Sequence, residues 1–169
     1  WDCPTVDLHD FDNRKDAISQ QLWDKATKVG FIQITNHGIA QSEIDKMFEM
    51  SAKFFALPAD VKRKIPWDKQ TNNGWEAGSE VLDEAVADLK ETYNVGFANM
   101  AGKFLEESDI AGFKQTVQHF QHLCEELSWK ILGCFALRLG FPEDFFKQHH
   151  DGTKPDCTKL LRLLYYPTA

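Results

Sequence analysis

The chain has 169 residues, of which 26 are acidic and 19 basic, so its formal net charge is −7, and 43% of its residues are hydrophobic. This length suits a globular chain of about 100 to 200 residues that buries its own core. This acidic balance argues against binding to nucleic acid or to an anionic membrane surface, because both need clustered Lys and Arg.

The sequence carries no targeting or membrane signal. Its apolar runs are all shorter than the roughly 18 to 20 residues that span a bilayer, and the N-terminus lacks the charged-then-apolar layout of a secretory signal. The four cysteines form no C-x-x-C pair, which favours small buried thiols in a reducing compartment over disulfides or a metal site. We therefore expect a cytoplasmic protein.

The first part of the chain predicts a strand, a helix and a second strand. Residues 4–8 alternate apolar and polar side chains, which is typical of a short strand. Apolar residues at three- and four-residue spacing then predict a helix that starts at Asp12 or Asn13 and stops at Gly30. Residues 31–35 follow at once as the second strand.

The next segment predicts a tight turn and two helices. Residues 36–38 read Asn-His-Gly, which indicates a turn. Ser42 begins a helix with one apolar face. A short helix of alternating charge opens at Pro58, and Pro66 ends it.

Residues 67–105 differ in character from the helices before them. Residues 72–74 indicate a turn into a strand, and residues 90–95 indicate a second strand, with an acidic stretch between the two. We predict an irregular hairpin or a pair of flaps in this region.

The strongest periodic signal follows, over residues 110–139. Apolar residues step by three or four throughout, which predicts a helix of about 30 residues, about 45 Å long, that stops at Gly140. Pro142 then starts a shorter helix that Gly152 ends, and residues 158–166 predict the last strand.

This order of elements argues against a doubly wound parallel sheet. A helix of this length is too long for an ordinary crossover connection, and no Gly-rich phosphate loop follows either early strand. The sequence instead predicts an α+β fold in which the long helix supports a sheet. Most of that sheet is expected to lie beyond Ala169.

The last strand carries the most informative candidate residue. With a side-chain period of two, Arg162, Leu164 and Tyr166 point to one face of the sheet. An arginine among apolar neighbours needs a partner if that face is buried, because an unpaired buried guanidinium is costly. Arg162 is thus either half of an internal salt bridge, which spacing alone favours, or an anchor for a polar or anionic ligand.

Two histidine groups are weak candidates for metal ligands. Residues 149–151 read His-His-Asp and so contain H-x-D, the two-ligand half of a facial iron triad, but only 18 residues follow and none of them is His. His119 and His122 are three residues apart on the predicted long helix, with no Cys or acidic partner at matching spacing. We assign no metal site to either group.

Several short motifs in order give the chain its family resemblance. They are residues 4–8, residues 30–39, residues 54–58 with Lys62, the Gly-aromatic pair 74–75, the D-x-K-E-x-Y segment 88–93 with Gly96, and the L-R-x-x-x-Y-P strand 161–167. In this order the motifs resemble the N-terminal region of the iron(II)- and 2-oxoglutarate-dependent dioxygenases of the isopenicillin N synthase type. The amino-acid sequence around residues 90–91, 112–114 and 160–167 is most similar to the fungal small-molecule branch, which includes thymine hydroxylases.

The resemblance implies a double-stranded β-helix, or jelly roll, with the long helix packed along its outside and incomplete at the C-terminus of this chain. It implies Fe(II) as cofactor and 2-oxoglutarate as cosubstrate. The iron ligands and the R-x-S that holds 2-oxoglutarate follow the Y-P strand in the family, so they are expected beyond Ala169. The H-x-D at residues 149–151 precedes that strand, and so it does not match the family's ligand pair.

Two residues of this chain match functional positions of the resembled family. Tyr166 matches a tyrosine that reaches cosubstrate or substrate in several relatives, and Arg162 matches an arginine that helps to hold substrate in some of them. Leu164 stands where an asparagine is frequent, so this chain departs from the pattern there. The resemblance thus implies a cosubstrate- or substrate-binding role for Arg162 and Tyr166, and no catalytic or metal-binding residue within the segment.

The functional prediction follows from this resemblance. Residues 1–105 are expected to supply N-terminal strands, helices and a flap, residues 106–151 support helices, and residues 158–169 a wall strand of the jelly roll. The chain would then be the N-terminal part of an oxygenase that hydroxylates or otherwise oxidises a small molecule with O2, without nucleic-acid or membrane partners. These 169 residues alone are expected to be inactive.

Two alternatives stay open at this point. The chain could come from a non-catalytic, truncated relative that works as an interaction module. It could also belong to an iron oxidase that does not use 2-oxoglutarate, as in isopenicillin N synthase itself. The residues downstream of Ala169 would distinguish the three readings.

Overall fold

The computed structural model describes residues 3–78 and 90–167 of the chain, which form two compact units. The first unit comprises residues up to Glu43 together with Gln121–His150, and the second comprises Ile44–Phe120 together with the residues from Asp151 on. Within the described ranges, every helix is too short or too polar to cross a lipid bilayer. The acidic stretch expected between two strands falls on residues 79–89, outside the described residues.

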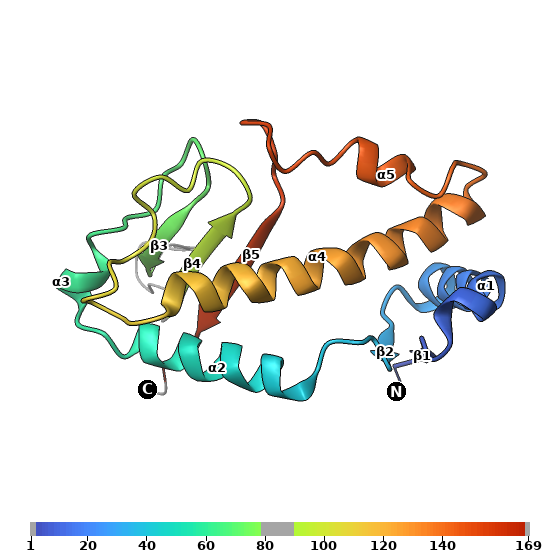
Figure 1. The fold of residues 1–169 in the computed structure, drawn as a ribbon, viewed down its shortest axis with the longest axis horizontal. Helices are drawn as coiled ribbons and strands as arrows, with labels where there is room; N and C mark the ends of the chain where they lie inside the picture. The colour runs from blue at the N-terminus through green and yellow to red at the C-terminus, as the bar shows by residue number, and fades with distance from the viewer. Residues whose placement is uncertain (1–2, 79–89, 168–169) are drawn as a thin grey trace. The chain divides into compact units, whose positions relative to one another are not determined.

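A parallel strand pair and a helix open the first unit (Figure 1). Strand β1 (Thr5–Asp7) pairs with β2 (Gln33–Thr35), and helix α1 (Phe11–Val29) connects them. Gly30 ends α1 with a φ of +86°, a left-handed conformation that glycine adopts without steric cost. The predicted strand, helix and strand are therefore confirmed.

The start of α1 differs from the prediction. The N-cap residue is Asp10, which has a φ of +51°, and neither Asp12 nor Asn13 caps the helix. The Asp10 carboxylate instead accepts a hydrogen bond from the Asn13 side-chain amide at 2.7 Å. Asp and Asn tolerate the left-handed conformation, so the turn before the helix lies slightly earlier in the chain than the apolar periodicity suggested.

The core of the first unit joins β1, α1 and the later turns of helix α4 (Phe113–Arg138). Its buried members are Val6, Leu8, Ile18, Leu22 and Cys134, with partly buried Leu127, Ile131 and Phe135 packed against them. Burial raises the pKa of the Cys134 thiol. All four cysteines are free, but only Cys134 is buried, so the expectation that all four are buried is wrong for the other three.

Helix α5 (Phe145–Gln148) is shorter than expected at both ends. Pro142 does not open the helix but accepts a hydrogen bond at its carbonyl from the Phe145 amide, which closes a turn ahead of it. The helix ends at Gln148, before Gly152, because the following residues form separate turns.

Two helices open the second unit. Helix α2 (Gln41–Phe55) confirms the predicted amphipathic helix, with Met47, Met50, Phe54 and Phe55 buried. Helix α3 (Ala59–Lys62) follows Pro58 as predicted. It ends four residues before Pro66, since residues 63–65 continue as a turn rather than a helix.

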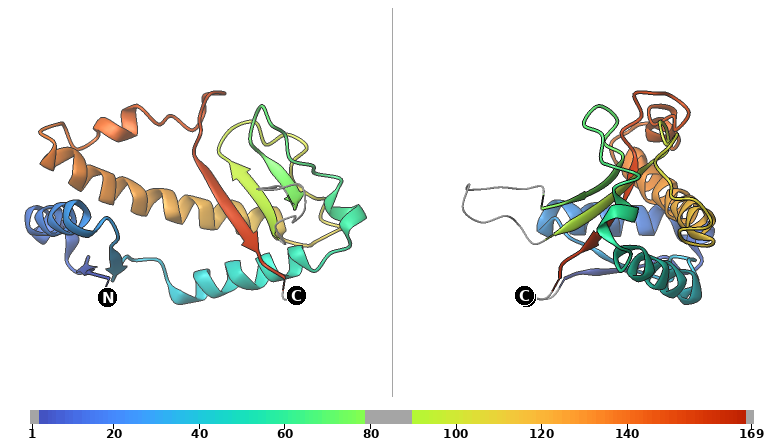
Figure 2. Two further views of the ribbon diagram at one scale, coloured as in Figure 1. Left: turned by 180° about the vertical axis from the view of Figure 1, so that it is seen from behind. Right: turned by 90° about the vertical axis from the view of Figure 1, so that its left-hand side faces the viewer.

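A three-stranded antiparallel sheet forms the rest of the second unit. Its order is β3 (Gly74–Ala77), β4 (Glu91–Gly96) and β5 (Leu160–Tyr165). Figure 1 shows the three strands side by side, and Figure 2 shows them from behind and from the side. The hairpin and the last strand are thus confirmed, and the chain has the predicted α+β class.

Helix α4 is the long helix that the periodicity predicted. It has 26 residues, or about 39 Å of rise, which is slightly shorter than expected. Gly112 precedes it with a φ of +69°, and Gly140 follows it with a φ of +80°, so left-handed glycines bound it closely on both sides.

An aromatic cluster fills the core of the second unit. Phe54 stacks on Phe113 at a ring-centroid distance of 4.8 Å, and Tyr93 lies 4.8 Å from Phe54 and 5.6 Å from Phe113. All three are fully buried. Tyr93 donates its hydroxyl hydrogen bond to the Lys103 carbonyl at 2.6 Å, and burial raises the pKa of this phenol. One face of the sheet is thereby fixed against α2 and the first turns of α4.

Candidate functional site

Strand β4 presents two chemically different faces. Tyr93 and Val95 belong to the aromatic core, so alternation places Thr92 and Asn94 on the opposite side of the sheet. Arg162 of β5 reaches the same side, because its Nε donates a hydrogen bond to Asn94 Oδ1 at 2.9 Å. We call this side the second face of the sheet.

The register of the antiparallel ladder sets the neighbours on the second face. Asn94 lies directly opposite Arg162, and Thr92 lies directly opposite Leu164. Arg162 and Leu164 are exposed, whereas Leu163 between them is buried on the core side. Alternation along the last strand, which the sequence predicted, is therefore confirmed for these residues.

Tyr166, the second predicted site residue, follows β5 by one position. Its side chain is 63% exposed. Its neighbour Tyr165 takes the opposite side and stacks on Phe55 at a centroid distance of 5.5 Å. Alternation puts Tyr166 on the side of Arg162 and Leu164, with its phenol accessible to a ligand.

Among the residues that the structure describes, Arg162 does not form the internal salt bridge that spacing alone favoured. Within residues 3–78 and 90–167, its guanidinium makes the hydrogen bond to Asn94 and no ion pair. Asn94 carries no charge, so this contact orients the guanidinium without neutralising it. The role of Arg162 toward a ligand stays a prediction.

Asn94 is itself held by a chain of side-chain hydrogen bonds. Its side chain is almost fully buried, at 2% exposure, and its Nδ2 donates to Asn72 Oδ1 at 3.1 Å. The same Asn72 oxygen accepts a hydrogen bond from Trp67 Nε1 at 2.9 Å. Arg162 and Trp67 can only donate, so each of them must face an amide oxygen, and these contacts fix the orientation of both amides.

The turn before β3 fixes the position of Asn72. Asn72 has a φ of +55° and Gly74 a φ of +107°, and a Cβ on Gly74 would lie 2.3 Å from the Pro66 carbonyl oxygen. Buried Asn73 ties the turn to β4 by accepting a hydrogen bond from the Gly96 amide at 2.8 Å. The turn can therefore form only with glycine at position 74.

A small cavity lies near this network. Gly96 and Leu160 pair two residues along the ladder from Asn94 and Arg162. Both line a cavity of about 150 Å³, together with Asn72 and residues 155–159. Thr71 also lines it, and its Oγ1 is buried without a hydrogen-bond partner in the described part of the chain.

Thr92 is a second unpartnered group on the second face. Its side chain is 3% exposed, and its Oγ1 has no hydrogen-bond partner among the described residues. Leaving a buried hydroxyl unsatisfied costs about 1–3 kcal/mol. The sequence did not single out Thr92, Asn94 or Asn72. Alternation groups the first two on one side of β4, but only the register of β4 with β5 places them beside Arg162 and Leu164.

A buried ion pair supports the core side of the same sheet. Lys62 Nζ donates to Glu91 Oε2 at 2.6 Å and to the Phe55 carbonyl at 2.7 Å. Glu91 Oε2 also accepts a hydrogen bond from Trp75 Nε1 at 2.8 Å. These residues come from three of the motifs that carry the family resemblance, and here they join α3, β3 and β4.

The histidine string 149–151 makes local hydrogen bonds, and His150 also contacts the Trp129 ring at a centroid distance of 6.3 Å. Each histidine Nδ1 is hydrogen-bonded to a carbonyl of the preceding turn, at 2.8 Å for His149 and 2.7 Å for His150. Asp151 accepts two hydrogen bonds from Thr153, which hold the pKa of its carboxyl below the usual value. No three His, Cys, Asp or Glu residues cluster anywhere in the described ranges, so these residues do not fit an iron site.

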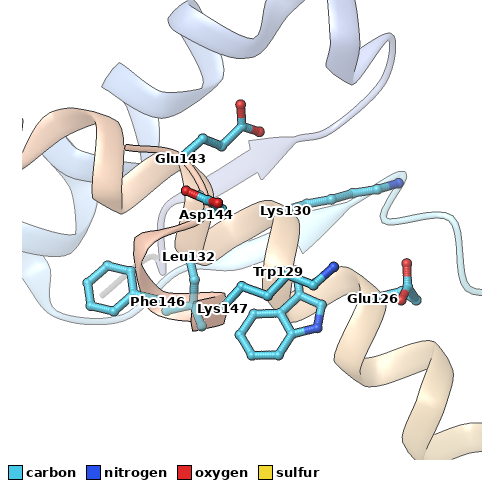
Figure 3. Close-up of a pocket in the computed structure, with 9 residues that line it drawn as sticks. Glu126, Trp129, Lys130, Leu132, Glu143, Asp144, Phe146 and Lys147 are labelled. Carbon is cyan, nitrogen blue, oxygen red and sulfur yellow. The ribbon is translucent and has the colours of Figure 1, made fainter. Parts of the chain in front are cut away.

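A surface groove of about 380 Å³ lies in the first unit between α4 and α5 (Figure 3). Its lining mixes both charge signs around Trp129, with Lys130 and Lys147 against Glu126, Glu143 and Asp144. Glu143 is already paired with Lys15 at 2.8 Å. The groove shows no convergent set of polar groups, so the second face of the sheet is the better candidate site.

Comparison with known proteins gives a family for these features. A family model described as non-haem dioxygenase in morphine synthesis, N-terminal, matches residues 3–126. Proline hydroxylase buaE of Petromyces alliaceus is 32% identical over 96% of this chain and 53% of its own length. The 2-oxoglutarate-dependent dioxygenase gloF of Glarea lozoyensis is 27% identical, over 96% of this chain and 55% of its own length.

Solved structures give the same fold. A full-length Neurospora crassa protein in complex with alpha-KG and 5-formyluracil has a TM-score of 0.81 and 26% identity, covering 98% of this chain and 52% of that one. The complex of the same Neurospora crassa protein with alpha-KG alone has a TM-score of 0.82 at 28% identity. The chain spans about half the length of the curated relatives that it matches.

Proposed function

Because the chain belongs to the non-haem dioxygenase family through its N-terminal region, we propose that it is the N-terminal part of an iron(II)- and 2-oxoglutarate-dependent oxygenase that oxidises a small molecule. The observation that carries this proposal is the likeness of nearly the whole chain, at a TM-score of 0.81, to a solved structure that holds alpha-KG and 5-formyluracil. A relative named as a proline hydroxylase supports a small-molecule substrate.

The sheet is proposed to be part of a jelly roll that the rest of the protein completes. In this arrangement residues 1–105 supply the N-terminal strands, helices and a flap, residues 106–151 supply the support helices, and residues 158–169 form a wall strand. The fixed core side of the sheet and the exposed Arg162, Leu164 and Tyr166 on its second face support this proposal. The second face would line the substrate side of the roll.

Iron and 2-oxoglutarate supply the oxidising chemistry in this family, and their ligands are proposed to lie beyond Ala169. The residues of this chain are proposed to bind and orient the small molecule. Arg162 would donate hydrogen bonds from its terminal amino groups, and Tyr166 would offer its exposed phenol. Molecular oxygen is the other proposed reactant.

The proposed partners are small molecules only. The net charge of −7 supports the prediction that neither nucleic acid nor a membrane is a partner. A cytoplasmic location stays a prediction.

The test uses the full-length protein with Fe(II), 2-oxoglutarate and a panel of small molecules that includes thymine and L-proline. We expect succinate formation that rises when a panel member is oxidised, with the product seen by mass spectrometry. Oxygen uptake with an oxidised product but without 2-oxoglutarate would favour the oxidase alternative. Absence of both succinate and oxygen uptake would favour the interaction module.

A further inference from the structure

We propose that Asn94 is a positioning residue that presents the guanidinium of Arg162 to a carboxylate-bearing ligand on the second face of the sheet. This inference rests on the proposed function, because it concerns the ligand of the same oxygenase. It goes further by naming the chemical class of the group bound and the residue that prepares the anchor.

Only one N–H donor of the Arg162 guanidinium is used by the described residues. Asn94 Oδ1 accepts the Nε–H of Arg162 at 2.9 Å, which occupies one of the five N–H donors. In the described part of the chain the two terminal amino groups have no hydrogen-bond partner, and the side chain is exposed. Their outer edge carries two parallel N–H groups, the geometry that matches a carboxylate.

The partner of Arg162 is a neutral asparagine. An aspartate at position 94 would orient Arg162 equally well but would also neutralise it. The asparagine supplies only a neutral carbonyl oxygen, so the positive charge of Arg162 stays uncompensated by the described residues. An anionic ligand gains from that charge, because hydrogen bonds between charged groups are about twice as strong as neutral ones.

A network of hydrogen bonds holds the partner of Arg162 in place. Asn94 is 2% exposed, and its amide is held between Arg162 and Asn72, while Asn72 is held by Trp67. An arginine side chain loses conformational entropy when it is fixed. This network fixes Arg162 before the ligand arrives, so less of that entropy is lost on binding.

The neighbours on the second face define the rest of the ligand. Leu164 is 47% exposed and lies next to Arg162 in the same strand, two residues along. Tyr166 lies two residues further and is 63% exposed. An anion anchor beside an exposed leucine and an exposed phenol suits a small acid with an apolar body. The acid could be the substrate or 2-oxoglutarate, which carries two carboxylates.

The experiment measures ligand affinity in the full-length protein by isothermal titration calorimetry, with 2-oxoglutarate and L-proline as separate probes. The variants are Asn94→Ala, Arg162→Ala and the double variant. We expect each single variant to weaken one of the two probes roughly tenfold, the loss of about one charge-assisted hydrogen bond. The double variant should be no weaker than Arg162→Ala alone, because Asn94 acts through Arg162.

Two further variants test the network while Asn94 itself stays in place, in case Asn94→Ala does not fold. Trp67→Phe keeps an aromatic ring but removes the indole N–H that holds Asn72, and it should weaken the same probe about two- to threefold with the fold intact. Ser19→Ala removes the side-chain hydrogen bond of a buried serine in the first unit and should leave both affinities unchanged. Circular dichroism and thermal unfolding check each variant.

The outcomes separate the two sources and the two hypotheses. Weakening of L-proline alone assigns the anchor to the substrate, and weakening of 2-oxoglutarate alone assigns it to the cosubstrate. The inference is overturned if wild-type protein binds neither carboxylate, if Asn94→Ala leaves both affinities unchanged, or if the two single losses add. Failure of the proposed function would appear separately, as absence of 2-oxoglutarate turnover in the wild-type protein.

Discussion

At the scale of single residues, the most demanding side chain is Lys62, a buried cation. Its side chain is 4% exposed and its partner Glu91 is 20% exposed, so the pair is asymmetric. Removing the partner of a buried charge costs more than removing the charge itself, because the remaining charge is left without solvent or compensation. The Lys62 ring contact with Trp75, at 5.3 Å, cannot replace a carboxylate.

We therefore predict that Glu91→Gln lowers the free energy of unfolding by about 3 kcal/mol, and that Lys62→Met lowers it by less. Lys15→Met is the matched control, since both members of its pair with Glu143 are partly exposed, at 32% and 50%, and such pairs contribute about 0–1 kcal/mol. Urea unfolding of the three variants would measure the order. Equal losses for Glu91→Gln and Lys15→Met would contradict a buried, compensated Lys62.

The site itself shows what a sequence can and cannot indicate at this scale. Strand alternation and a short motif marked Arg162 and Tyr166 as candidates, and their role toward a ligand stays a prediction. Asn94 was not singled out, since its role depends on Asn72 and Trp67, which approach it only through the turn before β3. The salt bridge favoured for Arg162 was wrong for the described residues because a neutral amide lies directly opposite it.

At the scale of elements, the turn that leads into β3 depends on one glycine. We predict that Gly74→Ala destabilises the protein by more than about 3 kcal/mol, because the φ of +107° strains any L-residue and the new Cβ would lie 2.3 Å from Pro66 O. Gly140→Ala is the matched control. Its φ is +80°, but no atom lies within 4 Å of its Cβ position, so only about 1 kcal/mol should be lost.

Thermal or urea unfolding would measure both glycine variants. Similar losses at the two positions would show that conformation alone, and not the contact with Pro66, makes Gly74 necessary. Because Asn72 lies in the same turn, Gly74→Ala should also weaken ligand binding on the second face. Gly140→Ala should not.

Element boundaries were less predictable than the elements. The periodicity of α4 indicated a helix over 110–139, and the helix spans Phe113–Arg138 because the flanking glycines adopt left-handed conformations. The start of α1 at Phe11 follows from a left-handed Asp10, which apolar spacing cannot reveal. Periodicity reports which face is buried, whereas one backbone angle decides where a helix begins or ends.

At the scale of the whole molecule, the proposed function assigns to this chain supporting structure and a ligand-binding surface. The motifs of the family resemblance lie in both units, and those in the second unit converge on one sheet through Lys62, Glu91 and Arg162. The described residues contain no group of three metal-ligating side chains. That the iron ligands of the proposed oxygenase lie beyond Ala169 stays a prediction.

The last prediction concerns the segment taken alone. We expect the 169-residue chain to bind no stoichiometric Fe(II) and to produce no succinate from 2-oxoglutarate, because a facial iron site needs three protein ligands in fixed geometry. Iron titration followed by absorbance, with succinate measured in parallel, would test this against the full-length protein as positive control. Turnover by the segment alone would place a complete iron site within these residues and would overturn the proposal that the iron ligands lie beyond Ala169.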